Sequence, residues 1–204
     1  MTVSVEFHFD FGSPNAYLSH LVIPAIEART GVRFEYIPVL LGGVFKATGN
    51  ASPAVTLRGI KNKGEYGNIE MRRFLTRHSI DNFKSNPHFP VNTLQIMRGA
   101  IYAEMTGFLK RYVDEVYRHM WAEPKKMDDQ DVVKSAFAES DLPVDELIAA
   151  MQDPEVKQAL ITNTERSVEI GSFGSPTFFV NGEIFFGKDK LRDVEEEIMT
   201  LLLH

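Results

Sequence analysis

The chain has 204 residues, 44% of them apolar and 25% charged, which is typical of a soluble globular protein with one substantial core and room for an inserted subdomain. Its 22 basic and 28 acidic residues give a formal net charge of −6 without a dense lysine or arginine stripe, which argues against nucleic acid or an anionic membrane as the main partner. No apolar run approaches the roughly 20 residues of a membrane span, and no basic region precedes an apolar run at the N-terminus, so we expect a cytoplasmic protein.

Cysteine is absent from the sequence. Disulfides, thiolate nucleophiles, iron–sulfur clusters and zinc sites that need cysteine are therefore excluded, and any sulfur nucleophile must be brought in by a ligand. The six histidines show neither H-x-H nor H-E-x-x-H spacing. We therefore expect no metal site.

The first strand is predicted at residues 3–9, where apolar and polar positions alternate, and a helix is predicted from Pro14 towards Thr30. Ser13 is a preferred N-cap, and Pro14 suits the first helical position. A helix N-terminus presents unpaired N–H groups and a partial positive charge, which favour an anion or a thiolate beside it. Ser13 is therefore placed either to cap the helix only or also to donate a hydrogen bond to a bound negative group.

A second strand is predicted at residues 32–37, so the first segment forms a β-α-β unit with a right-handed parallel pair. No strand pattern follows between residues 40 and 164. This stretch starts with a loop rich in Gly, Asn and Pro and continues as a series of helical patterns. The clearest helical runs are residues 93–105, 109–121, 131–138 and 144–151.

The last segment returns to β structure after a helix from Pro154 towards Ile170. Two apolar, aromatic-rich runs at residues 177–180 and 183–186 are joined by Asn-Gly, which predicts a hairpin whose aromatic residues lie in the strand core. A closing helix is predicted at residues 190–203.

The order β-α-β, helical insertion, α-β-β-α indicates an α/β protein with a large all-helical insertion, in an arrangement of the thioredoxin type. Periodicity gives only these elements, and the name of a thioredoxin-like fold depends on the resemblance described below. We expect residues 1–39 and 155–204 to form the thioredoxin-like domain. Residues 40–154 are expected to form the helical insertion subdomain.

Six short motifs support a more specific interpretation because they occur in one order with compatible spacing. They are Phe9-Asp10-Phe11-Gly12-Ser13-Pro14, Gly49-Asn50, Lys63-Gly64-Glu65-Tyr66, Phe89-Pro90-Val91-Asn92-Thr93, Gly174-Ser175-Pro176-Thr177-Phe178 and Phe186-Gly187-Lys188-Asp189-Lys190-Leu191. Together they resemble the 2-hydroxychromene-2-carboxylate isomerases of the DsbA-like, kappa-class glutathione transferase group. The resemblance covers essentially the full length of the chain.

The resemblance implies a role for the first helix start. Thioredoxin-fold oxidoreductases carry Cys-x-x-Cys where this chain has Ser13-Pro14-Asn15-Ala16, so the protein itself cannot perform thiol–disulfide exchange. The resemblance implies glutathione as the external thiol and Ser13 as the catalytic residue that stabilises its thiolate. A hydrogen bond and a helix dipole lower the pKa of a thiol in the same way for a ligand as for a cysteine.

Further glutathione-binding residues follow from the same resemblance. Ser175 and Pro176 match the cis-proline position, where the Ser175 backbone can pair with the cysteinyl part of glutathione, although a trans proline is the commoner isomer in general. Asn50 and Lys63 match positions that line the glutathione site. Lys63 can instead belong to a solvated basic face, and a departure in the preceding loop leaves Lys61 as its alternative.

The resemblance also assigns Lys188 and Asp189 to glutathione binding. Asp189 matches the position that binds the γ-glutamyl end, and it can equally cap the closing helix. Asn92 matches a position that faces the substrate, and as a residue just before a helical run it is also a good N-cap. Lys63 is the candidate cation for the carboxylate of the substrate.

The implied activity is a glutathione-dependent isomerase of aromatic-compound catabolism that interconverts 2-hydroxychromene-2-carboxylate and trans-o-hydroxybenzylidenepyruvate. Its substrate is a small aromatic carboxylate, and the family suggests a homodimer. Two alternatives remain: a kappa-like glutathione transferase or peroxidase, and a catalytically silent thioredoxin-like binding protein.

Overall fold

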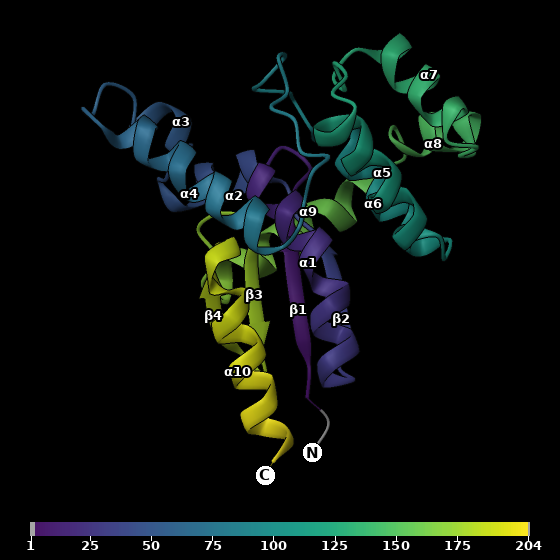
Figure 1. Ribbon diagram of the computed structural model, residues 1–204. Helices are drawn as coiled ribbons and strands as arrows, with labels where there is room; N and C mark the ends of the chain where they lie inside the picture. Colours follow the sequence, from purple (N-terminus) through teal and green to yellow (C-terminus); the bar gives the residue numbers. More distant parts are fainter. Residues whose placement is uncertain (1–2, 204) are drawn as a thin grey trace.

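A computed structural model describes residues 3–203 of the chain (Figure 1). Four strands form one mixed sheet in the order β2-β1-β3-β4: β1 (Val5–Phe9), β2 (Phe34–Pro38), β3 (Thr177–Val180) and β4 (Glu183–Phe186). Strands β1 and β2 are parallel, and the other two pairs are antiparallel. The predicted thioredoxin-like α/β fold is confirmed, and both hairpin strands have the predicted bounds.

Three helices cover the sheet: α1 (Pro14–Thr30), α9 (Pro154–Glu169) and α10 (Leu191–Leu202). Helices α1 and α10 pack against each other, whereas α9 packs against β2. Because successive residues of a strand point to opposite faces, the two sides of β1 can be told apart. Its His8 ring lies 2.8 Å from the hydroxyl of Ser167 in α9, so α9 covers the face of the even-numbered residues.

The other face of β1 carries an aromatic core. The Phe7 ring centre lies 4.9 Å from that of Tyr36 on β2 and 5.2 Å from that of Phe178 on β3. Tyr36 in turn packs edge-on against the ring of His20 in α1. The sheet is therefore the middle layer of three, and α1 starts at the end of β1 where the chain leaves that layer.

A block of helices gathers beyond the end of the sheet (Figure 1). It contains α5 (Leu94–Met105), α6 (Leu109–Tyr117) with its π-helical continuation (Arg118–Ala122), α7 (Gln130–Glu139) and α8 (Val144–Ala150). The four predicted helical runs of this segment are confirmed within one or two residues. They were recognisable because their apolar residues recur with the helical period.

The prediction of a loop after the second strand is wrong for most of that stretch. The structure has α2 (Leu41–Thr48), α3 (Pro53–Thr56) and α4 (Lys63–Arg77) in this stretch. Helix α2 begins with Leu-Gly-Gly and has no side-chain cap from its N-cap residue. Its first N–H donates instead to the carboxylate of Asp10 at 2.7 Å, a tertiary contact that local sequence signals do not contain.

Gly99 in α5 tests the packing of the helical block. A Cβ built on Gly99 lies 2.1 Å from the hydroxyl oxygen of Tyr112, whose ring is fully buried and whose hydroxyl donates to the carbonyl of Ile96. We expect Gly99→Ala to lower the free energy of unfolding by about 1–3 kcal/mol because the buried ring must move. Equilibrium unfolding in urea measures the change.

Gly67 in α4 provides the matched control for Gly99. A Cβ on Gly67 meets no atom within 4 Å, so alanine there adds helix propensity without a clash. Gly67→Ala should raise the free energy of unfolding by about 0.5–1 kcal/mol. Equal effects of the two substitutions would contradict this account of the packing.

Candidate active site

Ser13 begins α1 as the sequence predicts. Its backbone is extended, with φ −93° and ψ 113°, and its Oγ accepts a hydrogen bond from the Ala16 N–H at 3.2 Å. Pro14 occupies the first helical position. The hydrogen bond from Ala16 confirms the capping interpretation of Ser13. The residue is only 5% exposed, so its hydroxyl lies below the molecular surface.

The hydroxyl of Ser13 also contacts the strand that returns from the far end of the chain. It donates to the carbonyl oxygen of Ser175 at 2.9 Å. The Ser175–Pro176 peptide bond is cis, as the resemblance implies and against the general preference for trans. The Ser13 hydroxyl thus joins two segments 162 residues apart, and its proton is directed at the backbone in front of the cis proline.

Two backbone N–H groups beside this hydroxyl are open. Within residues 3–203 neither the Asn15 N–H nor the Ser175 N–H has a hydrogen-bond partner, and Asn15 and Ser175 are both partly exposed. The first lies in the first turn of α1, where the helix dipole favours negative charge. The second precedes the cis proline and can pair with an extended peptide. Both groups suit a peptide ligand that carries a negative atom.

Asp10 lies beneath the helix start and is fully buried. Its carboxylate accepts hydrogen bonds from the N–H groups of Gly12 at 2.8 Å and Leu41 at 2.7 Å, and from the side chain of Thr93. A Cβ on Gly12 lies 3.2 Å from both the Asp10 carboxylate and the Thr93 methyl group, so glycine lets the chain turn tightly here. Burial raises the pKa of Asp10 above its ordinary 3.8, and the three hydrogen bonds oppose that rise.

Sequence reasoning gave Asp10 no role beyond its place in a motif. The available signal was a short acidic residue between two phenylalanines at the end of a strand. A carboxyl group in such apolar surroundings needs partners, and those partners lie on segments far along the chain. The structure therefore adds Asp10 to the site as a positioning residue.

Asn50 connects α2 to the segment before the cis proline. Its Nδ2 donates to the carbonyl oxygen of Phe173 at 2.7 Å. The ring of Phe173 lies 4.4 Å from the ring of Phe186, and both are exposed, at 42% and 43%. The expectation that all hairpin aromatics lie in the core is therefore wrong for Phe186, because β4 is an edge strand.

Lys188 and Asp189 lie on a 3-10 turn (Lys188–Lys190). The residue before this turn, Gly187, joins it to the cis proline, because the Gly187 N–H donates to the Pro176 carbonyl at 2.9 Å. The Lys188 ammonium is buried, contacts the Asp189 carboxylate at 2.7 Å and lies 4.7 Å above the Phe74 ring. Asp189 does not cap α10, which starts without a side-chain cap, so the capping interpretation is wrong. Its side chain is 69% exposed and open to a ligand.

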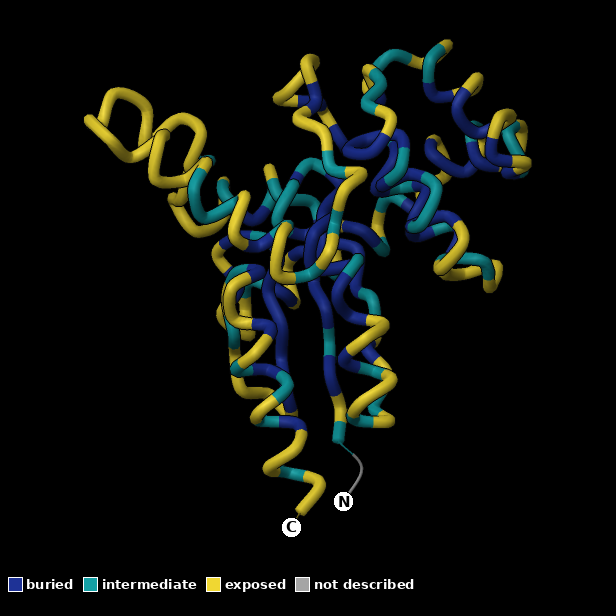
Figure 2. The backbone as a smooth tube through the Cα atoms, in the orientation of Figure 1, coloured by how far each residue is buried: buried dark blue, intermediate teal, exposed yellow. Residues whose placement is uncertain are grey.

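Lys63 is not brought to Ser13 by any described contact. It starts α4, and together with Lys61 it belongs to a segment, residues 51–68, that we call the helical arm. Figure 2 shows that the arm is exposed along nearly all its length and extends away from the sheet. The solvated basic face is therefore what this structure shows for Lys63 and Lys61.

Asn92 lies just before α5 and is exposed. Its side-chain oxygen accepts from the Leu94 N–H at 3.1 Å, so Asn92 supports the first turn of α5 from the position before the N-cap residue, Thr93. The next residue, Thr93, contacts Asp10 and Gly12. Asn92 is thus one residue away from the contacts that support the Ser13 turn.

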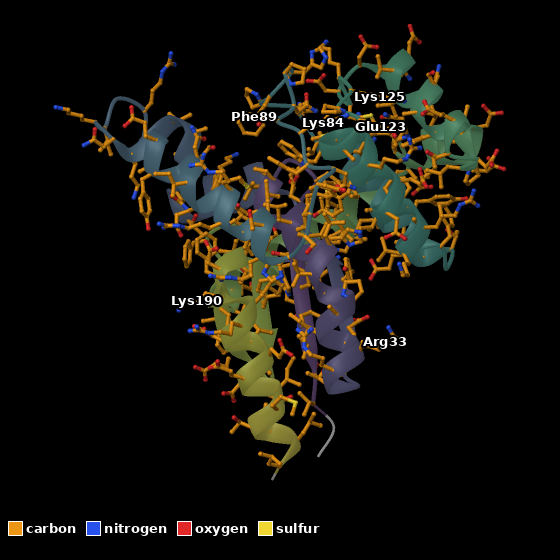
Figure 3. The ribbon with its side chains drawn as sticks, viewed as in Figure 1. Arg33, Lys84, Phe89, Glu123, Lys125 and Lys190 are labelled. Carbon is orange, nitrogen blue, oxygen red and sulfur yellow. The ribbon has the colours of Figure 1, made fainter. Side chains whose placement is uncertain are left out.

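A separate cluster of ionisable groups lies at the far end of the helical block. His119, Glu123 and Glu139 each offer one ligand atom within 4.8 Å of the others. Arg118 pairs with Glu123 at 2.6 Å, and Lys125 pairs with Glu139; Figure 3 shows Glu123 and Lys125 on this part of the block. Two cations already neutralise these carboxylates, so the cluster is an ion-pair network and carries no metal assignment.

The fold, the cis proline and the serine at the start of α1 agree with a comparison against known families. The description "DSBA-like thioredoxin domain" matches residues 4–199. The chain belongs to this family. In this member, a helical segment interrupts the sheet in sequence, and helix α1 starts beside the cis proline.

Relatives of the chain within this family carry two names. A 2-hydroxychromene-2-carboxylate isomerase from Sphingobium xenophagum is 25% identical over 200 residues, which cover 98% of this chain and 100% of the relative. A glutathione S-transferase kappa 1 from Caenorhabditis elegans is 24% identical over 201 residues, which cover 91% and 86%. Enzymes of both kinds are therefore related to this member of the family.

Solved structures show the same fold. A 2-hydroxychromene-2-carboxylate isomerase superposes with a TM-score of 0.83 at 23% identity, over 97% of this chain and 95% of the other. A probable DsbA oxidoreductase from Streptomyces coelicolor superposes with a TM-score of 0.70 at 15% identity, over 97% and 89%. Among residues 3–203 of this chain, no helix is both long and apolar enough to cross a membrane.

Replacing Asp10 tests whether its carboxylate holds the site together. Asp10→Ala leaves three donors without their acceptor, two partly buried and one on buried Thr93, and we expect it to lower the free energy of unfolding by about 3 kcal/mol or more. Asp10→Asn keeps one acceptor oxygen and should cost less. Asp81→Ala, at an exposed position, is the control and should stay within about 0.5 kcal/mol of the native protein in urea unfolding.

The pH dependence of stability gives a second test of Asp10. The pKa of Asp10 is raised in the folded state, so protonation of Asp10 stabilises the fold. This contribution to the free energy of unfolding is complete at pH values below the pKa of the unfolded state, and it is lost as pH rises through the pKa of the folded state. The free energy of unfolding of the native protein, minus that of Asp10→Asn, should therefore fall as pH rises above about 4. Urea unfolding across a pH series measures it, and a rising or constant difference would contradict the burial argument.

Proposed function

We propose that this protein is a glutathione-dependent isomerase that interconverts 2-hydroxychromene-2-carboxylate and trans-o-hydroxybenzylidenepyruvate. The supporting observation is the Ser13 hydroxyl at the start of α1, 2.9 Å from the Ser175 carbonyl before a cis proline, in a chain without cysteine. A site for an external thiol needs such a donor, whereas thiol–disulfide exchange by the protein needs two cysteines. The relatives named as this isomerase and as a kappa glutathione transferase support the choice of thiol and of reaction.

Open polar groups at the start of α1, before the cis proline and on the 3-10 turn fit the chemistry of glutathione. The N–H groups of Asn15 and Ser175 lack partners within residues 3–203, and they match a thiolate and an extended peptide backbone. The exposed Asp189 carboxylate suits the ammonium of the γ-glutamyl end, and its neighbour Lys188 fixes the direction of that carboxylate. The Asn50 amide, which bonds the segment before the cis proline, completes the proposed peptide site.

Ser13 is the proposed catalytic residue. Its hydroxyl can rotate from the Ser175 carbonyl to the ligand sulfur, while the Asn15 N–H and the helix dipole add to the stabilisation of negative charge. Bound glutathione supplies a thiolate whose transient addition makes the substrate double bond single, so that it can rotate before elimination. We propose that Asn92 faces the substrate, and that Lys63 or Lys61 on the helical arm pairs with its carboxylate.

We further propose that the thioredoxin-like domain comprises residues 1–39 and 155–204, that residues 40–154 form an insertion subdomain, and that the protein acts as a cytoplasmic homodimer. The helical arm supports the homodimer. It exposes four large apolar side chains that a second copy can cover. These are Val55, Leu57, Ile60 and Tyr66, with exposed fractions between 39% and 69%.

The ultraviolet spectrum of the substrate measures the proposed reaction. Purified protein with glutathione should convert the substrate, and protein alone should not. Ser13→Ala removes the proposed donor to sulfur and should lower the rate with glutathione by about 10²–10³-fold.

Asp153→Ala is the matched control for Ser13→Ala. Asp153 is the N-cap of α9, with proline at the next position, so its loss removes a comparable cap. It should leave the rate unchanged at a temperature where both variants are folded. Equal rates with and without glutathione would refute the proposal.

Two further measurements separate the alternatives. Consumption of glutathione in the presence of electrophilic model substrates would indicate transferase activity, because isomerisation returns the thiol unchanged. Absence of binding heat in a calorimetric titration with glutathione would favour a catalytically silent binding protein.

A further inference from the structure

An apolar groove runs between α2, α5 and α9, on the α9 side of the sheet. Its volume is about 360 Å³, and Ser13 and Ser175 are not among the residues that line it. The walls are formed by aliphatic side chains from all three helices or their starts. These are Leu40, Leu94, Leu160, Ile161 and Val168.

The groove is preformed by bonds within its floor. The Thr164 hydroxyl accepts from the Leu40 N–H at 3.0 Å and donates to the Leu160 carbonyl at 2.7 Å. A Cβ built on Gly43 lies 3.0 Å from the Thr164 methyl group, so α2 approaches α9 this closely because glycine stands at the contact. A ligand therefore meets a shaped site and does not have to create one.

The charged groups that line the groove are mostly positive. Lys46, Arg98 and Lys157 contribute cations, and Glu165 contributes the single carboxylate. Among the described residues, 3–203, none of these three cations has a carboxylate partner within 4.0 Å. By contrast, Lys110, Arg118, Lys125 and Lys126 of the helical block are each paired with a carboxylate. The groove thus combines an aliphatic surface with positive charge that the protein itself leaves unmatched.

Arg98 also has hydrogen-bond donors that lack acceptors within the described residues. One of its five N–H donors has a described acceptor, the Met151 carbonyl at 3.3 Å from Nη1. Its Nε is buried and has no hydrogen-bond partner in the part of the chain that the structure describes. Buried donors are nearly always satisfied, and a guanidinium fork matches a carboxylate with two parallel bonds.

We propose that this groove binds a small amphipathic carboxylate, with its aliphatic part against the leucine and isoleucine wall and its carboxylate near Arg98 and Lys157. Apolar burial supplies affinity, and the cations select the negative end. The site is separate from the proposed glutathione site, because the two share no lining residue. Its existence does not depend on the isomerase activity.

Octanoate is a suitable probe, and isothermal calorimetry of the full-length protein is the measurement. We expect saturable binding of octanoate, and binding of octylammonium weaker by about tenfold or more, because the same apolar tail then brings a cation to a positive groove. Arg98→Gln and Lys157→Gln should each weaken octanoate binding by about tenfold. The side chain of Lys157 makes no hydrogen bond or ion pair among the described residues, so its variant tests the charge even if Arg98→Gln unfolds.

Two variants serve as controls for location. Ile161 is 48% exposed, so Ile161→Asp should fold, and it should abolish octanoate binding by placing a carboxylate in the wall. Lys134→Gln makes the same charge change on the remote helix α7, where Lys134 is exposed, and should leave binding unchanged.

Three results would overturn the proposal. Equal binding of octanoate and octylammonium would mean adsorption to an apolar surface without charge recognition. Loss of octanoate binding in Ser13→Ala would place the ligand at the Ser13 site instead. Absence of saturable binding by the native protein would leave the groove without this role.

Discussion

The rest of the structure depends on the hydrogen bonds made by the buried carboxylate of Asp10. It closes the end of β1, holds the first N–H of α2 and contacts Thr93 at the start of α5. Its backbone carbonyl also accepts from the Ser13 N–H at 3.1 Å. Placing a carboxylate in an apolar interior is unfavourable, and three donors from three segments offset that cost. The helical segment and the first turn of α1 therefore share one anchor.

The candidate site joins the two halves of the thioredoxin-like fold through a hydroxyl group. In this chain Ser13 contributes a hydroxyl donor, which donates a hydrogen bond to the Ser175 carbonyl. The neighbouring N–H groups of Asn15 and Ser175 are already open within the described residues. Under the proposed function, a ligand sulfur would exchange the internal hydrogen bond of Ser13 for an external one and gain the Asn15 N–H as a second donor, while the Ser175 N–H would pair with the peptide backbone of the ligand.

The apolar groove and the candidate active site are connected through two consecutive amides. The Leu40 N–H bonds Thr164 on the floor of the groove, and the Leu41 N–H bonds Asp10 beneath Ser13. These two bonds fix the start of α2 between the sheet and α9. Helix α2 then ends at Gly49, next to Asn50, which bonds the segment before the cis proline. One short helix thus borders both the apolar groove and the candidate active site.

The sequence by itself determined the elements whose signals are local: the Ser13 cap with Pro14, the Asn-Gly hairpin and the periodic helices of the insertion. Because cysteine is absent, it also excluded a protein thiol as nucleophile. Only the tertiary structure decided that α2 forms, that Asp10 is its cap, and that Lys63 lies on an exposed helical arm. The physical reason is range: a cap or a strand turn is specified within about four residues. The partners of a buried carboxylate or a serine hydroxyl come from segments that meet only when the chain is folded.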